Sequence, residues 1–168
     1  MRPPPGFRAA ATHRLPAPAH EARRLQGLLL AHGPVTTDDL GEQLVSAAFG
    51  GTLMERGNKD FDIQCRRYGR VEVRTRILGT DGWLPRITLR RPPDGAYDHL
   101  AAVRLEQDRS FWRALILPTA ALAPLYARYK QAKGIAHIPW EAAAAESAAE
   151  DITARLRGML DGGGKVGH

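Results

Sequence analysis

Apolar and polar residues alternate over residues 60–76, and this period of two predicts a β-hairpin. One face has Phe61, Ile63 and Cys65 on the first strand and Val71, Val73 and the β-branched Thr75 on the second. A turn at Tyr68-Gly69 separates the two strands. Because side chains two residues apart share a face, Glu72 and Arg74 point together, away from the valines. Asp62 projects to the same face if the register permits.

Helix and strand patterns continue on both sides of the hairpin. Helices are expected over residues 19–32, from a cap at Thr37 or Asp38 to about Ala48, from 120 to 130 after a cap at Thr119, and from 140 to 160. Gly50-Gly51 marks the end of the second of these helices. Strands are expected at 52–54 and 87–89, and buried central strands over 97–105 and 111–117.

These patterns predict one α/β domain over residues 19–160, with a mixed central β-sheet flanked by helices. Residues 1–18 contain five prolines and no apolar period, so we expect a disordered, basic, proline-rich tail there. The glycines at 162–164 predict a flexible C-terminus over residues 161–168.

Two carboxylates and a cation beside an apolar core are costly unless they have a task or a counter-charge. The pattern of Asp62, Glu72-Val73-Arg74 and the earlier Glu42 resembles the PD-(D/E)XK nuclease superfamily. That family has an Asp at the start of one strand, Glu-x-Lys on the next strand and often a Glu on the preceding helix. The resemblance covers residues 38–118 and implies a restriction-endonuclease-like core.

The resemblance implies a DNA-cleaving enzyme that uses Mg²⁺ or Mn²⁺. Asp62, Glu72 and the carbonyl of Val73 would be the metal ligands, and Glu42 would hold a metal-bound water or a second ion. The chain departs from the family at Arg74, where the motif has Lys. Because arginine does not lose its proton near neutral pH, a catalytically silent DNA-binding or protein-interaction module is the main alternative. By analogy with small nucleases of this fold, a homodimer is a further expectation.

The charge of the chain favours an anionic partner. Its formal net charge is +6 and its pI is about 10.0. Most of the 24 cationic residues are Arg, which binds phosphate bidentately, although a GC-rich genome would produce the same bias. We expect the DNA contacts to be Arg66, Arg74, Arg76 and Lys59.

The candidate residues also have interpretations that involve no catalytic role. Glu72 and Arg74 can be cross-strand charge pairs on an exposed strand face, and Glu42 can face either solvent or an active site. A segment over residues 28–44 also resembles the opening of a winged-helix domain, but no recognition helix follows it.

Other chemistries find little support in the sequence. Cys65 is the single cysteine and falls on the apolar side of the hairpin, so we expect a buried structural thiol. The histidines form no metal-binding pattern, and neither a nucleophile elbow nor a phosphate-binding loop is present. Without an apolar run of 18 residues we expect no membrane span and a cytoplasmic protein.

Overall fold

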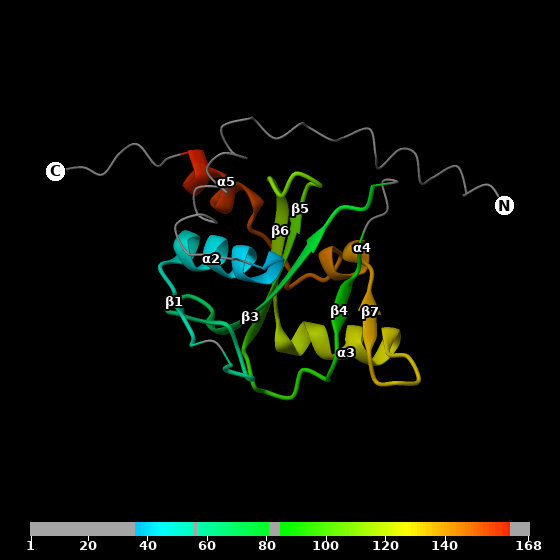
Figure 1. Ribbon diagram of the computed structural model, residues 1–168. Coiled ribbons are helices and arrows are strands. Elements are labelled where there is room, and N and C mark those ends of the chain that lie inside the picture. The colour runs from blue at the N-terminus through cyan, green and yellow to red at the C-terminus, as the bar shows by residue number, and fades with distance from the viewer. Residues whose placement is uncertain (1–35, 56, 81–84, 162–168) are drawn as a thin grey trace.

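Six strands form a mixed central sheet in the order β1-β2-β3-β5-β6-β8, and helices pack on its two faces (Figure 1). The computed structural model describes residues 36–55, 57–80 and 85–161. The strands of this sheet are β1 (Thr52–Leu53), β2 (Ile63–Cys65), β3 (Gly69–Ile77), β5 (His99–Leu105), β6 (Phe111–Pro118) and β8 (Glu150–Asp151). A separate two-stranded sheet pairs β4 (Ile87–Leu89) with β7 (Ala136–Ile138). The helices are α2 (Thr37–Phe49), α3 (Thr119–Tyr129), α4 (Trp140–Ala144) and α5 (Thr153–Asp161).

The predicted mixed α/β fold is confirmed. The predicted hairpin is the antiparallel pair of β2 and β3, with Ile63 opposite Val71 and Cys65 opposite Gly69. The turn therefore comprises residues 66–68, and Gly69 begins the second strand with a left-handed φ of 69°. β3 runs parallel to β5, and β5 runs antiparallel to β6. The two central strands expected from their apolar runs are nearly continuously buried.

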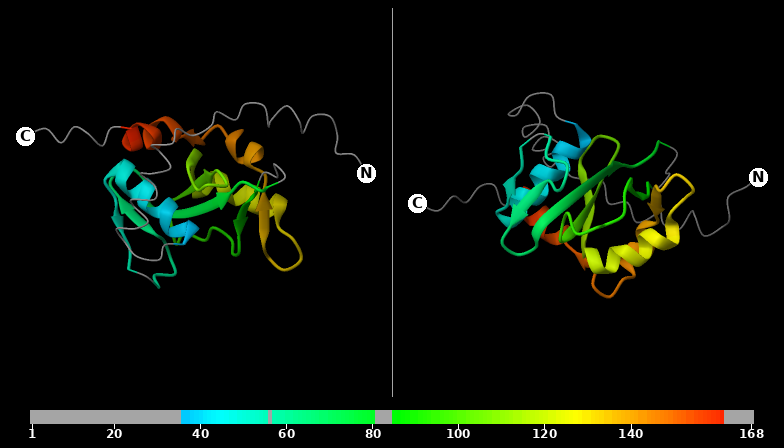
Figure 2. Two further views of the ribbon diagram at one scale, coloured as in Figure 1. Left: turned by 45° about the horizontal axis from the view of Figure 1, so that its top comes forward. Right: turned by 90° about the horizontal axis from the view of Figure 1, so that it is seen from below.

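Two core layers sandwich the sheet. Alternate residues of the central strands, including Val71, Val73 and Val103, pack with α2 and α5. The intervening residues, including Leu100 and Leu115, pack with α3, α4 and the small β4–β7 sheet. Figure 2 shows α2 and α3 on opposite faces of the sheet. Both faces of β3 are therefore covered, and this decides the environment of Glu72.

Helix α2 begins one residue earlier than expected. Thr36, rather than Thr37 or Asp38, is the N-cap, and it forms a capping box with Asp39. The helix ends at the predicted place, because Gly50 adopts the left-handed C-cap conformation with φ of 62°. Gly41 faces β3 so closely that its missing side chain is what permits the contact with Thr75.

The predicted helix over residues 140–160 is wrong. It is divided into α4, the edge strand β8 and α5. The outer edge of β6 offers backbone groups that need partners, and Glu150 and Asp151 pair with it in spite of their alanine-rich surroundings. Thr119 is also not a cap: it is the first residue of α3, and its hydroxyl donates to the carbonyl of Tyr97.

Several expectations concern segments beyond the described residues, namely the tail at 1–18, the helix over 19–32 and the end of the chain from 162. In the part of the chain that the structure covers, no helix is both long and apolar enough to cross a membrane.

Candidate functional site

Asp62 and Glu72 lie together where the hairpin meets the rest of the sheet. The backbone N–H of Asp62 donates to the carbonyl of Val71 at 3.0 Å, which places Asp62 immediately before β2. Because Ile63 is paired with Val71, Asp62 stands opposite Glu72, and the two carboxyl groups influence each other's pKa. The sequence-based prediction that these two acids share one face is confirmed.

Asp62 also has a structural task at the edge of β3. β2 pairs with residues 69–71, and beyond them the backbone N–H of Val73 donates to Oδ2 of Asp62 at 2.7 Å. The N–H of Thr75 donates in the same way to Asp38 at 3.3 Å. Carboxylates therefore take the place of a neighbouring strand along this edge, and they hold Asp62 in position.

Glu72 is buried, with 7% of its surface exposed. The alternative that it lies on an exposed strand face is therefore wrong, because the second core layer covers that face. Its carboxylate forms an ion pair with Arg74, whose Nη1 also donates to the carbonyl of Val73 at 3.2 Å. The Arg74 guanidinium thus bridges two of the groups that the sequence suggested as metal ligands.

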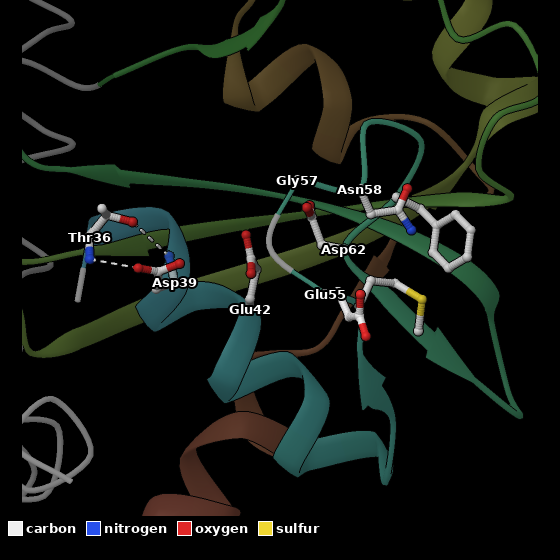
Figure 3. A pocket seen from close by; sticks show the side chains of 9 residues that line it. Thr36, Asp39, Glu42, Glu55, Gly57, Asn58 and Asp62 are labelled. Carbon is white, nitrogen blue, oxygen red and sulfur yellow. Dashed lines mark hydrogen bonds between the residues drawn. The ribbon is translucent and has the colours of Figure 1, made fainter. Parts of the chain in front are cut away.

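Glu42 faces the same site from α2. An open pocket of about 240 Å³ lies between the start of α2 and the loop that leads into β2. The side chains of Glu42 and Asp62 both extend into this opening (Figure 3). Asp39 and Glu55 line it as well, so the pocket is rich in acids. Glu42 is therefore half-buried and lines the pocket.

Burial raises the pKa of all three carboxyl groups, and the charge of Asp62 adds to the rise at Glu42 and Glu72. Burial is the largest cause of the rise of the Glu42 pKa to about 7 from its ordinary value of 4.5, and the charge of Asp62 adds to it. Burial also raises the pKa of Glu72 to about 7, although the charge of Arg74 opposes the rise. The pKa of Asp62 is raised by burial against the hydrogen bond from Val73. Such a cluster holds protons near neutral pH and favours the approach of a cation.

The cations expected to contact DNA are distributed unevenly around this site. Arg74 lies within it, and Arg76 on the same strand donates through Nη1 to the carbonyl of Thr75 at 2.8 Å. Lys59 is exposed in the loop before β2, and Arg66 is exposed in the hairpin turn. The sequence offered no signal for Arg91, which lies in irregular chain after β4. Its guanidinium donates to the carbonyl of Lys59, and its charge lowers the pKa of Glu72.

Within the described residues, no three His, Cys, Asp or Glu side chains are arranged as a ready metal-binding group. The chain matches no protein-family model, and no curated protein is detectably similar to it in sequence.

The crowding of acids has a consequence for stability. With EDTA present, Glu42→Gln should stabilise the fold by about 1 kcal/mol at pH 8, a value discounted for solvent screening, and have little effect at pH 5. Because the pKa of Glu42 is raised in the folded state, ionisation of this carboxyl lowers the free energy of unfolding as pH rises from 4.5 to about 7. Gln does not ionise, so the variant avoids this loss. Thermal unfolding of both proteins across this range measures the difference. Glu146→Gln, outside the pocket, is the control, and equal stability at pH 8 would contradict the account.

Proposed function

We propose that this protein is a metal-dependent nuclease that hydrolyses phosphodiester bonds of DNA. The observation that carries the proposal is a group of three carboxylates: Glu42 and Asp62 line one open pocket, and the buried Glu72 lies beside Asp62. Glu42 comes from α2, Asp62 from the loop before β2 and Glu72 from β3, and all three have raised pKa values. The order of helix, hairpin and further strands also agrees with the resemblance to the PD-(D/E)XK nucleases.

The donor set suits Mg²⁺ or Mn²⁺, which prefer oxygen ligands. Asp62 and Glu72 would hold the ion, with Glu42 beside them, and the mutual repulsion of these carboxylates supports a demand for positive charge. When bound, the ion would neutralise charge on the phosphodiester and activate water. Glu72 and Val73 must exchange their contacts with Arg74 for this ion.

The residues around the pocket would accept a proton and contact the DNA phosphates. Glu42, with a pKa of about 7, is suited to accept a proton from the attacking water on a carboxylate oxygen. The guanidinium of Arg74, once released from Glu72, can contact the scissile phosphate. Arg91 and Lys59 meet at the loop before β2 and supply positive charge for the flanking backbone. A homodimer, with one strand cut by each copy, belongs to this proposal and rests on the resemblance.

A second candidate is a catalytically silent relative that binds DNA or a protein partner. The observation in its favour is the position of Arg74, which links the Glu72 carboxylate to the Val73 carbonyl. In that arrangement the guanidinium is itself the counter-charge, and Asp62 serves as a cap for the edge of β3. The two candidates differ in whether the site responds to metal ions.

Plasmid nicking by Arg74 variants tests the proposal. We expect slow nicking by the wild type with Mg²⁺ or Mn²⁺, and about tenfold faster nicking by Arg74→Lys, because the compact ammonium leaves Glu72 more easily and approaches the attacking water more closely. Arg74→Ala should nick more slowly than the wild type, since charge stabilisation of the transition state is lost.

Two outcomes would change this assignment. Brisk cleavage by the wild type with slower cleavage by Arg74→Lys would make Arg74 an adapted catalytic residue. No cleavage by any of the three proteins, with DNA binding retained, would favour the silent relative.

A further inference from the structure

Three arginines lie in one row across three neighbouring strands. Arg76 of β3 is paired with Arg104 of β5, and Arg104 is paired with Arg113 of β6. Residues paired in this way project from the same face of a sheet. The guanidinium of Arg76 is held at the edge of β3, close to Thr75 and Asp38. Arg104 and Arg113 remain together under α4, as two like charges side by side.

Arg104 is an unusually buried cation, with 2% of its surface exposed. Its Nη2 donates to the carbonyl of Pro85 at 2.7 Å. Among the described residues, its Nε and Nη1 have no hydrogen-bond partner, and neither does the buried Nε of Arg113. Burial, followed by the charge of Arg113, lowers the pKa of Arg104 to about 10. Three buried nitrogen atoms without hydrogen-bond acceptors in the described part of the chain, on a pair of cations, create a strong demand for an anion.

The described residues around Arg104 and Arg113 balance their charge only in part and leave three guanidinium nitrogens without acceptors. The Arg104 guanidinium lies 4.4 Å from the centre of the Trp140 ring, and that of Arg113 lies 4.8 Å from the centres of both the Trp112 and Trp140 rings. Indole faces attract cations but accept no strong hydrogen bond. Nη2 of Arg113 lies 3.7 Å from Oε1 of Glu141, whose side chain is 68% exposed, so this ion pair is weak.

We propose that Arg104 and Arg113, between Trp112 and Trp140, form a binding site for a phosphate group. Planar guanidinium groups match phosphate oxygens bidentately, and the unpaired N–H donors are the groups that such oxygens would accept from. The side chain of Arg113 is 34% exposed, so phosphate reaches the site from the solvent at this residue. Phosphate then replaces the Glu141 carboxylate as the ion-pair partner of Arg113. The site is distinct from the acidic pocket, since α4 packs in the core layer opposite α2.

Calorimetric titration of the full chain with inorganic phosphate, at constant ionic strength in chloride, tests this site. Saturable binding is expected, about tenfold weaker in Arg113→Gln because a charge-assisted contact is lost, and a few-fold tighter in Glu141→Gln because the competing carboxylate is gone. Arg128→Gln is the matched control, since Arg128 is an exposed arginine stacked on Tyr129 of α3. Asp62→Asn should bind phosphate like the wild type, so the result does not depend on the acidic pocket.

A duplex oligonucleotide without terminal phosphates identifies the source of the phosphate group. If it displaces inorganic phosphate and binds more weakly to Arg113→Gln, the site takes the nucleic-acid backbone. If phosphate binds and the duplex does not compete, the site takes free phosphate or a phosphomonoester. Absence of saturable binding to the wild type, or equal affinities of wild type, Arg113→Gln and Glu141→Gln, would overturn the proposal and leave the arginines as structural partners of the tryptophans.

Discussion

Glu72→Gln should reduce metal-dependent nicking of plasmid DNA by about 100- to 1,000-fold or more, the usual loss when a charged group of a catalytic site is removed. The amide preserves the shape of the side chain but not the negative charge that faces Asp62 and Arg74. Asp62→Asn should have an equally large effect, and its amide oxygen can still accept the hydrogen bond from Val73. Both variants should therefore fold while losing activity.

Asp60→Asn is the matched control for this experiment. Asp60 lies two residues before Asp62 and is exposed, so its substitution should leave nicking unchanged. Thermal unfolding in EDTA checks that each variant is folded, and Glu72→Gln should melt no lower than the wild type because a crowded buried carboxylate is removed. If Glu72→Gln and Asp62→Asn both nick plasmid DNA as fast as the wild type, these two acids are not catalytic.

Gly41→Ala should destabilise the fold by about 3 kcal/mol. A Cβ atom at this position would lie 1.8 Å from Oγ1 and 3.0 Å from Cβ of Thr75, so α2 would have to move away from β3. The same displacement would carry the next residue, Glu42, away from Asp62. Chemical denaturation measures the stability, and nicking measures the effect on the pocket.

Gly158→Ala provides the contrast within one protein. Gly158 is exposed in α5, and a Cβ there meets nothing within 4 Å, so alanine should stabilise the fold by up to about 1 kcal/mol. Thr75→Ala removes the nearest obstructing atom and should restore part of the stability lost in Gly41→Ala. Equal stabilities of Gly41→Ala and the wild type would contradict the described packing of α2 on β3.

The part of the fold that the sequence predicted is the part that depends on local pattern. The alternation around Ile63 and Val71 was sufficient for the hairpin, and the apolar runs were sufficient for β5 and β6. Gly50 was sufficient for the end of α2, since glycine has a specific role in that C-cap conformation. The pairing of Asp62 with Glu72 followed from the same alternation.

The features that the sequence did not predict depend on contacts between distant segments. Glu72 looked like a residue of an exposed face because its strand alternates, yet α3 and the β4–β7 sheet cover that face. β8 lies in a helix-forming stretch and exists because the edge of β6 needs partners. Arg91 and Arg104 gain their positions through loop and cross-strand contacts, for which local periodicity carries no signal.

Metal binding by the purified protein tests the central proposal most directly. Thermal unfolding is measured at pH 7.5 with EDTA, Mg²⁺ or Mn²⁺ for the wild type, Glu72→Gln, Asp62→Asn and Asp60→Asn. An ion that binds only the folded state raises the melting temperature in proportion to its occupancy, so the wild type and Asp60→Asn should be stabilised by several degrees at millimolar metal. Glu72→Gln and Asp62→Asn should show no such rise. A wild-type melting temperature that is unchanged by millimolar Mg²⁺ and Mn²⁺ would contradict the assignment of these carboxylates to a metal-dependent nuclease site.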